Sequence, residues 1–327
     1  MTENFVLYSN IAVYSAMAIY TIAFIMFTLD LSRRSASVAA PAEVGATTRV
    51  GQLASAGSTT LLERVEAPAA PPATKGPRYL RAAVVLTAFG WALHVGAAFF
   101  RGFAAGRVPW ANMFEFTLTA TAIIVGVFLL VQFWQDLRFL GAFVVGFSLI
   151  ALGIATTNFY VDVVPLPPAL QSAWLVIHVF VASLGTGFFA LGAALSIVQL
   201  LQARRAAGRA VGLRFLDTLP AADKLENLAY RLIVVGFVFW TFTLIAGAVW
   251  AERAWGRYWG WDTKEVWTFI IWTIFAGYIH ARATRGWRGS RSAWLAIIGF
   301  GAVVFNFTIV NLFFKGLHSY SGIPGVG

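Results

Sequence analysis

Eight apolar runs, each about as long as a lipid bilayer is thick, restrict this chain more than any other feature of its sequence. A helix needs ~20 apolar residues to cross the ~30 Å hydrocarbon core. Spanning backbone must satisfy its own hydrogen bonds, and the short alternating segments of a membrane barrel are absent from the sequence. The sequence therefore predicts an all-α polytopic membrane protein with about eight transmembrane helices. The predicted spans are 5–29, 80–99, 112–134, 139–157, 171–201, 230–250, 266–283 and 294–314.

The positive charges gather in alternate connecting segments. The chain has a formal net charge of +10, which in a soluble protein would suggest nucleic acid. When residue 1 is placed outside, 18 of the 24 Lys and Arg residues fall in inner segments, as the positive-inside rule requires. The charge therefore indicates the orientation in the plasma membrane: both termini and the Trp-rich loop at 252–265 are extracytoplasmic. No nucleic acid partner is expected.

Three parts follow one another along the chain. Residues 1–31 are predicted to form an N-terminal transmembrane helix, because the run is too long for a cleaved signal peptide and has no small-residue cleavage site after it. Residues 32–78 are rich in Ala, Ser, Thr, Gly and Pro and are predicted to be a flexible cytoplasmic linker. Residues 79–327 then make up the transmembrane core.

The stretch 255–265, which reads WGRYWGWDTKE, is the most unusual in the chain. An aromatic belt at the membrane surface would explain its Trp and Tyr residues but not the interleaved glycines, which mark close approach of a backbone or ligand. If the stretch is helical, Trp255, Trp259 and Asp262 share one face and form an aromatic shelf for a large planar ligand. The candidate binding residues are Trp255, Gly256, Tyr258, Trp259, Gly260, Trp261 and Asp262.

Any metal chemistry in this chain has to run through histidine. There is no cysteine, and the four histidines are His94, His178, His280 and His318. His178 is expected ~10 Å below the outer boundary and His318 just past the last span, so the two can face one another beside the Trp-rich loop. Two imidazoles flanking an aromatic surface make a bis-histidine haem site. Cations for the haem propionates lie on the same side at Arg253, Arg257, Lys264 and Lys315.

Structural explanations remain open for two of the polar residues in the spans. His178 could be a hydrogen-bonded structural histidine, although an ionisable side chain within the membrane is a functional candidate by default. Glu115, at the head of the third span, is explained as well by Arg107 and the helix dipole as by a functional role.

Three further motifs stand out besides the stretch 255–265. They are YIHAR at 278–282, GWRG at 286–289 and GLHSY at 316–320. Together the four motifs resemble the CcsA/ResC family of System II cytochrome c maturation, whose members are tryptophan-rich proteins that handle haem, and the stretch 255–265 is similar to the WWD signature of that family. The similarity is strongest over 220–322 and extends more weakly back to about residue 80.

The resemblance implies that haem b arrives from the cytoplasmic side and is presented outside for thioether attachment to the Cys-x-x-Cys-His segment of apocytochrome c. It assigns His178 and His318 to an outer haem and His280 to a haem within the membrane. It also implies two kinds of partner, a CcsB/ResB-type membrane subunit and thiol-reducing maturation proteins. The chain would be the haem-handling subunit of a holocytochrome c synthase complex that acts by positioning, so no catalytic residue is assigned.

The inner haem needs a second ligand besides His280. By helix rise, His280 lies ~20 Å below the outer boundary and His94 ~20 Å above the inner one, so in a ~30 Å core their depths differ by ~10 Å. Two axial nitrogens on one iron lie only ~4 Å apart. The sequence therefore predicts that a partner subunit supplies the ligand opposite His280 and that His94 is a packed, hydrogen-bonded residue, with a ligand role for His94 as the alternative. A b-type haem electron-transfer subunit and a transporter of another solute are the alternative functions.

Overall fold

The computed structural model describes residues 2–39, 78–164, 171–210, 212–284, 286–318 and 322, and every regular element within these ranges is helical. The long helices are α1 (Thr2–Ala39), α2 (Arg78–Ala105), α3 (Met113–Val131), α4 (Gly141–Asn158), α5 (Ala173–Ala206), α6 (Ala222–Trp255), α7 (Thr263–Thr284) and α8 (Ser290–Phe307). The short elements are the 3-10 turns η1 (Arg138–Leu140) and η3 (Arg214–Thr218) and the helix α9 (Ile309–Phe313).

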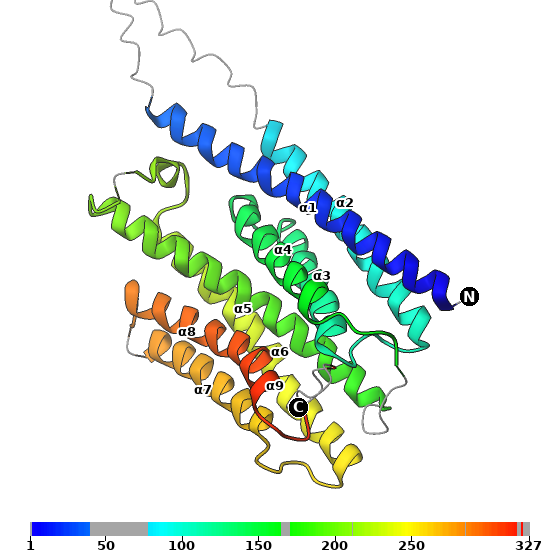
Figure 1. Cartoon of the computed structure of the whole chain (residues 1–327). Helices are drawn as coiled ribbons and strands as arrows, with labels where there is room; N and C mark the ends of the chain where they lie inside the picture. The colour runs from blue at the N-terminus through cyan, green and yellow to red at the C-terminus, as the bar shows by residue number, and fades with distance from the viewer. Residues whose placement is uncertain are drawn as a thin grey trace, which may run out of the picture.

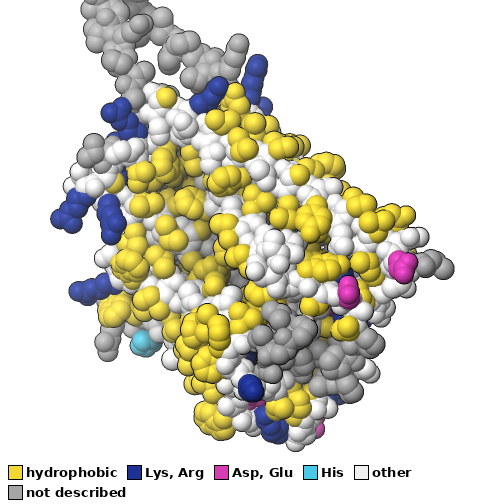
Figure 2. Space-filling model, in the orientation of Figure 1, with side chains coloured by type: hydrophobic (Ala, Val, Ile, Leu, Met, Phe, Trp, Pro, Cys, Tyr) yellow, Lys and Arg dark blue, Asp and Glu magenta, His cyan; other side chains and the backbone are white. Residues whose placement is uncertain are grey.

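The long helices lie side by side in one bundle (Figure 1). The α1–α2 hairpin forms one flank and the α7–α8 pair forms the other, with α3 to α6 between them. We call the end of the bundle that carries residues 255–265 the loop end. Hydrophobic side chains cover much of the face seen in Figure 2, and the Lys and Arg side chains visible there lie mainly along the upper and left edges. This surface suits a bundle that is surrounded by lipid.

The helices match the eight predicted spans. Seven of them are long and apolar enough to cross a membrane, namely α1 to α6 and the α8–α9 pair over Ser290–Phe313. The helix α7 occupies the remaining predicted span, and its first and last turns carry Glu265 and Arg282. The prediction of an all-α polytopic membrane protein is therefore confirmed. The side of the membrane on which the termini lie stays a prediction.

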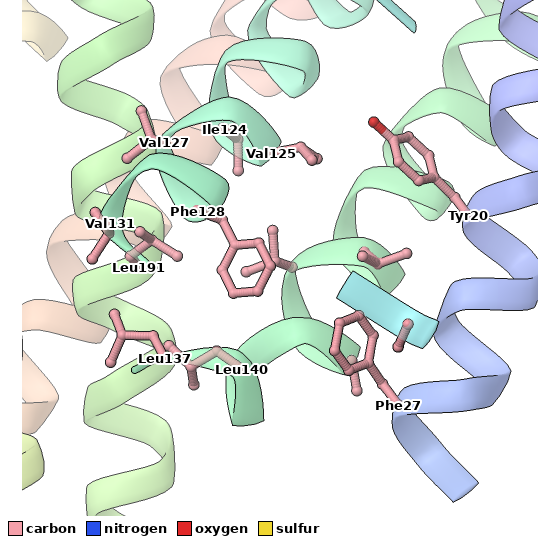
Figure 3. Close-up of a cluster of buried hydrophobic side chains, with 14 of the residues drawn as sticks. Tyr20, Phe27, Ile124, Val125, Val127, Phe128, Val131, Leu137, Leu140 and Leu191 are labelled. Atoms are coloured by element: carbon pink, nitrogen blue, oxygen red, sulfur yellow. The ribbon is translucent and has the colours of Figure 1, made fainter. Parts of the chain in front are cut away.

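The first helix is part of the bundle. It continues past residue 31 into the predicted linker, whose remainder (40–77) lies outside the described residues. The Phe27 ring of α1 occupies the space that a side chain at Gly141 of α4 would fill. Figure 3 shows Tyr20 and Phe27 reaching from α1 into the buried hydrophobic cluster. Because these large rings are removed from lipid or water by α2 and α4, α1 shares its core with the rest of the bundle.

The helices α5 and α6 approach closely because glycines face large side chains across their interface. A Cβ atom on Gly192 would lie 2.5 Å from Ile233, and one on Gly236 would lie 2.9 Å from the Phe189 ring. Small residues at such interfaces let transmembrane helices pack backbone to backbone. Phe189 also stacks on Phe275 of α7, with ring centroids 3.6 Å apart. The three helices α5, α6 and α7 are thereby packed into one unit that supports the loop end.

A buried ion-pair cluster fixes the beginning of α3 at the loop end. The Glu115 carboxylate is fully buried and accepts hydrogen bonds from Arg107 at 2.7 Å and from Arg101 at 3.2 Å. Arg101 is also buried and donates to the Val161 carbonyl at 2.6 Å, which ties the chain after α4 to the same cluster. The contact with Arg107 agrees with the structural explanation of Glu115, and Arg101 adds a second cation. This carboxylate therefore joins α2, α3 and the segment after α4.

Candidate functional site

A cavity of about 380 Å³ lies at the loop end and is lined by residues of every helix from α3 to α9. Its walls are mainly apolar and aromatic, and its size falls within the ~300–1,000 Å³ of typical small-molecule sites. The lining includes His178 and His318 together with Tyr258, Trp259 and Lys264 of the loop region. The structure thus brings two of the predicted histidines and part of the Trp-rich loop to one cavity.

The imidazole of His178, in the second turn of α5, has one ring nitrogen engaged. Its Nδ1 lies 3.0 Å from the carbonyl oxygen of Thr243 on α6. A carbonyl only accepts, so Nδ1 carries the proton and donates it. Gly247, one turn further along α6, leaves room for the ring, because a Cβ atom there would lie 2.8 Å from Cε1 of His178. The Nε2 lone pair is therefore the one available to a metal, and the carbonyl fixes the tautomer as in metal-bound histidines.

A carboxylate holds His318 in the same way. Nδ1 of His318 donates to Oδ2 of Asp262 at 2.7 Å, and Oδ1 of Asp262 accepts the backbone N–H of Leu317 at 2.9 Å. Glycine is required at position 316, because a Cβ atom on Gly316 would collide with Oδ1 of Asp262. Burial opposes ionisation of Asp262, but the hydrogen bonds from His318 and from backbone N–H groups outweigh it and hold the pKa below its usual value. The ionised carboxylate leaves Nε2 of His318 as the available ligand atom.

Two tryptophans contact the histidines, Trp250 both of them and Trp255 only His318. Trp250 stacks on the His178 ring with centroids 5.9 Å apart and meets the His318 ring edge-on at 5.3 Å. Trp255 lies 4.8 Å from the His318 ring. Trp250 was not among the predicted residues. Its place on the same face of α6 as Gly247 is the signal that could have found it, once His178 was known to pack on that face.

Beyond Trp255 the Trp-rich loop is not helical, so the condition under which Trp255, Trp259 and Asp262 would share a helical face is not met. The helix α6 ends at Trp255 because Gly256 adopts the left-handed conformation with φ 68°, which terminates a helix. Trp261 also has a positive φ, of 60°, and is 77% exposed. The tryptophans therefore point to different surroundings and do not form one flat shelf.

A capping box shapes the second half of the loop. Glu265 accepts the backbone N–H of Gly260 at 2.7 Å and that of Asp262 at 3.1 Å. Asp262 in turn accepts the backbone N–H of Lys264 at 3.3 Å. This reciprocal pattern of an acidic cap and a glutamate three residues later satisfies the first N–H groups of α7. Asp262 thus begins α7 and orients His318 at the same time.

The four cations predicted for haem propionates differ in their surroundings. Arg257 pairs with Glu265 at 3.3 Å, and its guanidinium occupies the space that a side chain at Gly260 would fill. Arg253 and Lys315 are exposed. Of the four, Lys264 is the one that lines the cavity. Arg257 is therefore committed to the loop, and the charge nearest to a ligand in the cavity comes from Lys264.

The other two histidines lie on opposite flanks of the bundle. His280 is exposed on α7, towards the end of that helix that is remote from the loop. His94 is fully buried on α2, and its Nδ1 lies 3.3 Å from the hydroxyl of Tyr20. Because α2 and α7 lie on different sides of the bundle (Figure 1), the structure does not bring His94 and His280 together.

A model of the cytochrome c assembly protein family matches residues 110–318, which include the whole cavity rim from α3 to His318. The cytochrome c biogenesis protein CcsA of Trieres chinensis is 34% identical over 252 residues, covering 67% of this chain and 80% of that protein. CcsA of Guillardia theta is 37% identical over 232 residues, covering 66% of this chain and 77% of that protein.

One solved structure, described as cytochrome c heme lyase CcmF, has a similar fold. Its TM-score to this chain is 0.62 at 16% sequence identity, and the match covers 93% of this chain and 46% of the lyase. The chain therefore spans about half the length of that protein. At this identity the likeness shows a shared arrangement of helices.

Proposed function

Because this chain belongs to the cytochrome c assembly protein family and is a haem-handling membrane protein of cytochrome c biogenesis, we propose that its loop-end cavity presents haem to apocytochrome c. In this proposal the loop end faces the extracytoplasmic side of the plasma membrane. Haem b is carried to it from the cytoplasmic side and is joined by thioether bonds to the Cys-x-x-Cys-His segment of apocytochrome c. The chain is then the haem-handling subunit of a holocytochrome c synthase complex.

One observation carries this proposal. His178 and His318 line the same apolar cavity, and each has Nδ1 engaged within the chain while Nε2 is available. Paired imidazoles with fixed tautomers are the donor set that holds a six-coordinate haem iron. His94 also has Nδ1 near a partner, Tyr20, and no partner at Nε2 within the described residues, but it is fully buried in the packed core and does not line this cavity.

Bound haem supplies the iron and the vinyl groups that react with the cysteines. The residues of this chain position it: Asp262 holds His318, and Thr243 holds His178. Trp250 and Trp255 confine the two imidazoles. The apolar wall excludes water from the macrocycle, and no acid–base residue is needed for this role. A thiol-reducing maturation protein keeps the cysteines of the substrate reduced.

A second haem position is proposed at His280, together with a CcsB/ResB-type subunit. His280 is exposed on a helix at the flank of the bundle, where a neighbouring membrane subunit can reach it. His94 lies buried on the opposite flank. The ligand opposite His280 therefore comes from the partner, and His94 is a packing residue bonded to Tyr20.

Absorption spectroscopy of the full chain, co-expressed with a CcsB/ResB-type subunit and purified in detergent, tests the proposal. His178→Ala and His318→Ala should each lose the outer six-coordinate haem and abolish cytochrome c maturation, while the protein still inserts and folds. His94→Gln is the matched control, because it changes a histidine outside both sites and keeps a hydrogen-bonding group near Tyr20. Unchanged haem content and unchanged maturation in both alanine variants would end the assignment.

A further inference from the structure

Several buried polar atoms in the cavity wall have no hydrogen-bond partner within the described part of the chain. They come from two walls, the beginning of α3 and the α8–α9 segment, and they belong to residues that line the cavity with His178 and His318. A buried polar group without a partner is costly, and in native proteins each case calls for an explanation such as a ligand. The atoms are Nε1 of Trp110, Nδ2 of Asn112, Oδ1 of Asn306 and Oδ1 of Asn311.

The two atoms at the beginning of α3 are donors. Asn112 is the N-cap of α3, and its Oδ1 accepts the backbone N–H of Glu115 at 2.9 Å. The cap bond determines which end of the amide is which, so the unpartnered end is the NH₂ group. Asn112 is only 4% exposed. The indole N–H of Trp110 can only donate.

The same wall favours negative charge. A helix N-terminus concentrates partial positive charge, and α3 begins directly after Asn112. The nearest carboxylate on that wall, Glu115, is already neutralised by Arg101 and Arg107. Across the cavity, Asn311 is 6% exposed, and its amide can present its NH₂ group by rotation, while Lys264 adds a cation. Glu265 also lines the cavity, but it pairs with Arg257.

We propose that Trp110 and Asn112 form a carboxylate subsite that takes a propionate of the haem. This inference rests on the proposed outer haem. It assigns the propionate to the α3 wall, whereas the sequence predicted cations such as Arg253 and Arg257 as its partners. A carboxylate can accept hydrogen bonds from both donors at once, and its charge is stabilised by the N-terminus of α3. The apolar edge of the macrocycle has no hydrogen-bond acceptor for these donors. Anchoring the propionate edge at α3 also determines which edge of the ring is left facing the Trp-rich loop.

The substitution Asn112→Asp tests the subsite, because aspartate is as good an N-cap as asparagine but replaces the donor by an anion. Haem and its propionate dimethyl ester are titrated into full-length protein in detergent. The wild type should bind haem about tenfold more tightly than the ester, because the ester keeps a carbonyl acceptor but loses the charge that strengthens both hydrogen bonds. Asn112→Asp should weaken haem binding but hardly change ester binding, so that the preference for haem disappears. Trp110→Phe should partly reduce the preference for haem over the ester.

Asn158→Asp is the matched control, since it adds the same charge on an exposed residue at the end of α4. It should leave the preference for haem unchanged. If both Asn112→Asp and Trp110→Phe still prefer haem to its ester, the subsite is overturned. Equal binding of haem and ester by the wild type would overturn it too. That result is expected if an anionic lipid headgroup or water occupies the position beside Trp110 and Asn112. The proposal that His178 ligates the outer haem fails separately, if His178→Ala binds haem as well as the wild type does.

Discussion

Two polar clusters meet at the beginning of α3, and they differ in where their hydrogen-bond partners come from. In the first, Glu115 has both carboxylate oxygens occupied by Arg101 and Arg107. In the second, the Asn112 amide nitrogen, three residues earlier, is buried with no partner within the described residues. One turn of helix thus carries a carboxylate that is complete within the chain and an amide that is not.

The difference separates structural from functional polarity. A buried charge that is paired within the chain holds helices together whether or not a ligand is present. A buried donor that is left unpaired is compensated only when a ligand arrives. Substitutions in the first cluster are therefore expected to lower stability, and substitutions around the cavity are expected to lower haem binding with little change in stability.

The largest effect is expected for Glu115→Ala. It leaves Arg101 and Arg107 buried without their carboxylate, and breaking a buried ion pair in this way costs about 3–5 kcal/mol of folding stability. The unfolding temperature of the detergent-purified protein should fall strongly. Asp162→Ala is the control, since Asp162 is an exposed carboxylate at the same end of the bundle. If Glu115→Ala unfolds like the wild type but fails to bind haem, the comparison between the two clusters is wrong.

Next in size is Asp262→Asn. Its single amide oxygen can accept from His318 or from the backbone N–H of Leu317 but not from both. It also lacks the charge that raises the basicity of a ligating imidazole, and loss of such a partner costs about 10–100-fold in metal affinity. Haem titration and the midpoint potential of the bound haem measure the change. Asp162→Asn removes a carboxylate that does not contact either histidine and should leave both quantities unchanged. A wild-type potential in Asp262→Asn would show that the charge does not act on the iron ligand.

A smaller effect is expected for Gly316→Ala. The added methyl collides with Asp262, so the segment that carries His318 has to shift, at a cost of about 1 kcal/mol or roughly fivefold in haem affinity. Gly301→Ala is the matched control, because a Cβ atom at Gly301 has no neighbour within 4 Å. Equal haem affinity in the two variants would mean that His318 is not held by Asp262 in solution.

The smallest effect near neutral pH concerns the same pair. The pKa of Asp262 is lowered in the folded protein from a reference value of 3.8, so its contribution to stability is complete above about pH 4 and is lost as the pH falls through the lowered pKa. Tryptophan fluorescence should therefore show an acid transition below pH ~4, because Trp250 and Trp255 contact His318, which Asp262 holds. Asp262→Asn should lack this acid transition, and a transition that persists in it must come from another group.

Much of the fold could be predicted from local sequence. The length and polarity of the apolar runs placed all eight long helices, because a bilayer demands about the same number of apolar residues from every span. Gly256 was a candidate binding residue, and in the structure it terminates α6, so the helix that would put Trp255, Trp259 and Asp262 on one face does not continue. A helical period is a reliable guide only where no residue with a left-handed preference interrupts it.

Hydropathy and residue counts along helices are local properties of the chain, and they were enough to place the long helices and to indicate which histidines could meet at one end of the bundle. The hydrogen-bond partners of those histidines depend on how the helices pack. The partners of His318 and His178 are Asp262 and Thr243, on other segments far away in the sequence. Whether a buried donor such as Asn112 finds a partner depends on every helix packed around it, so no local pattern encodes the answer.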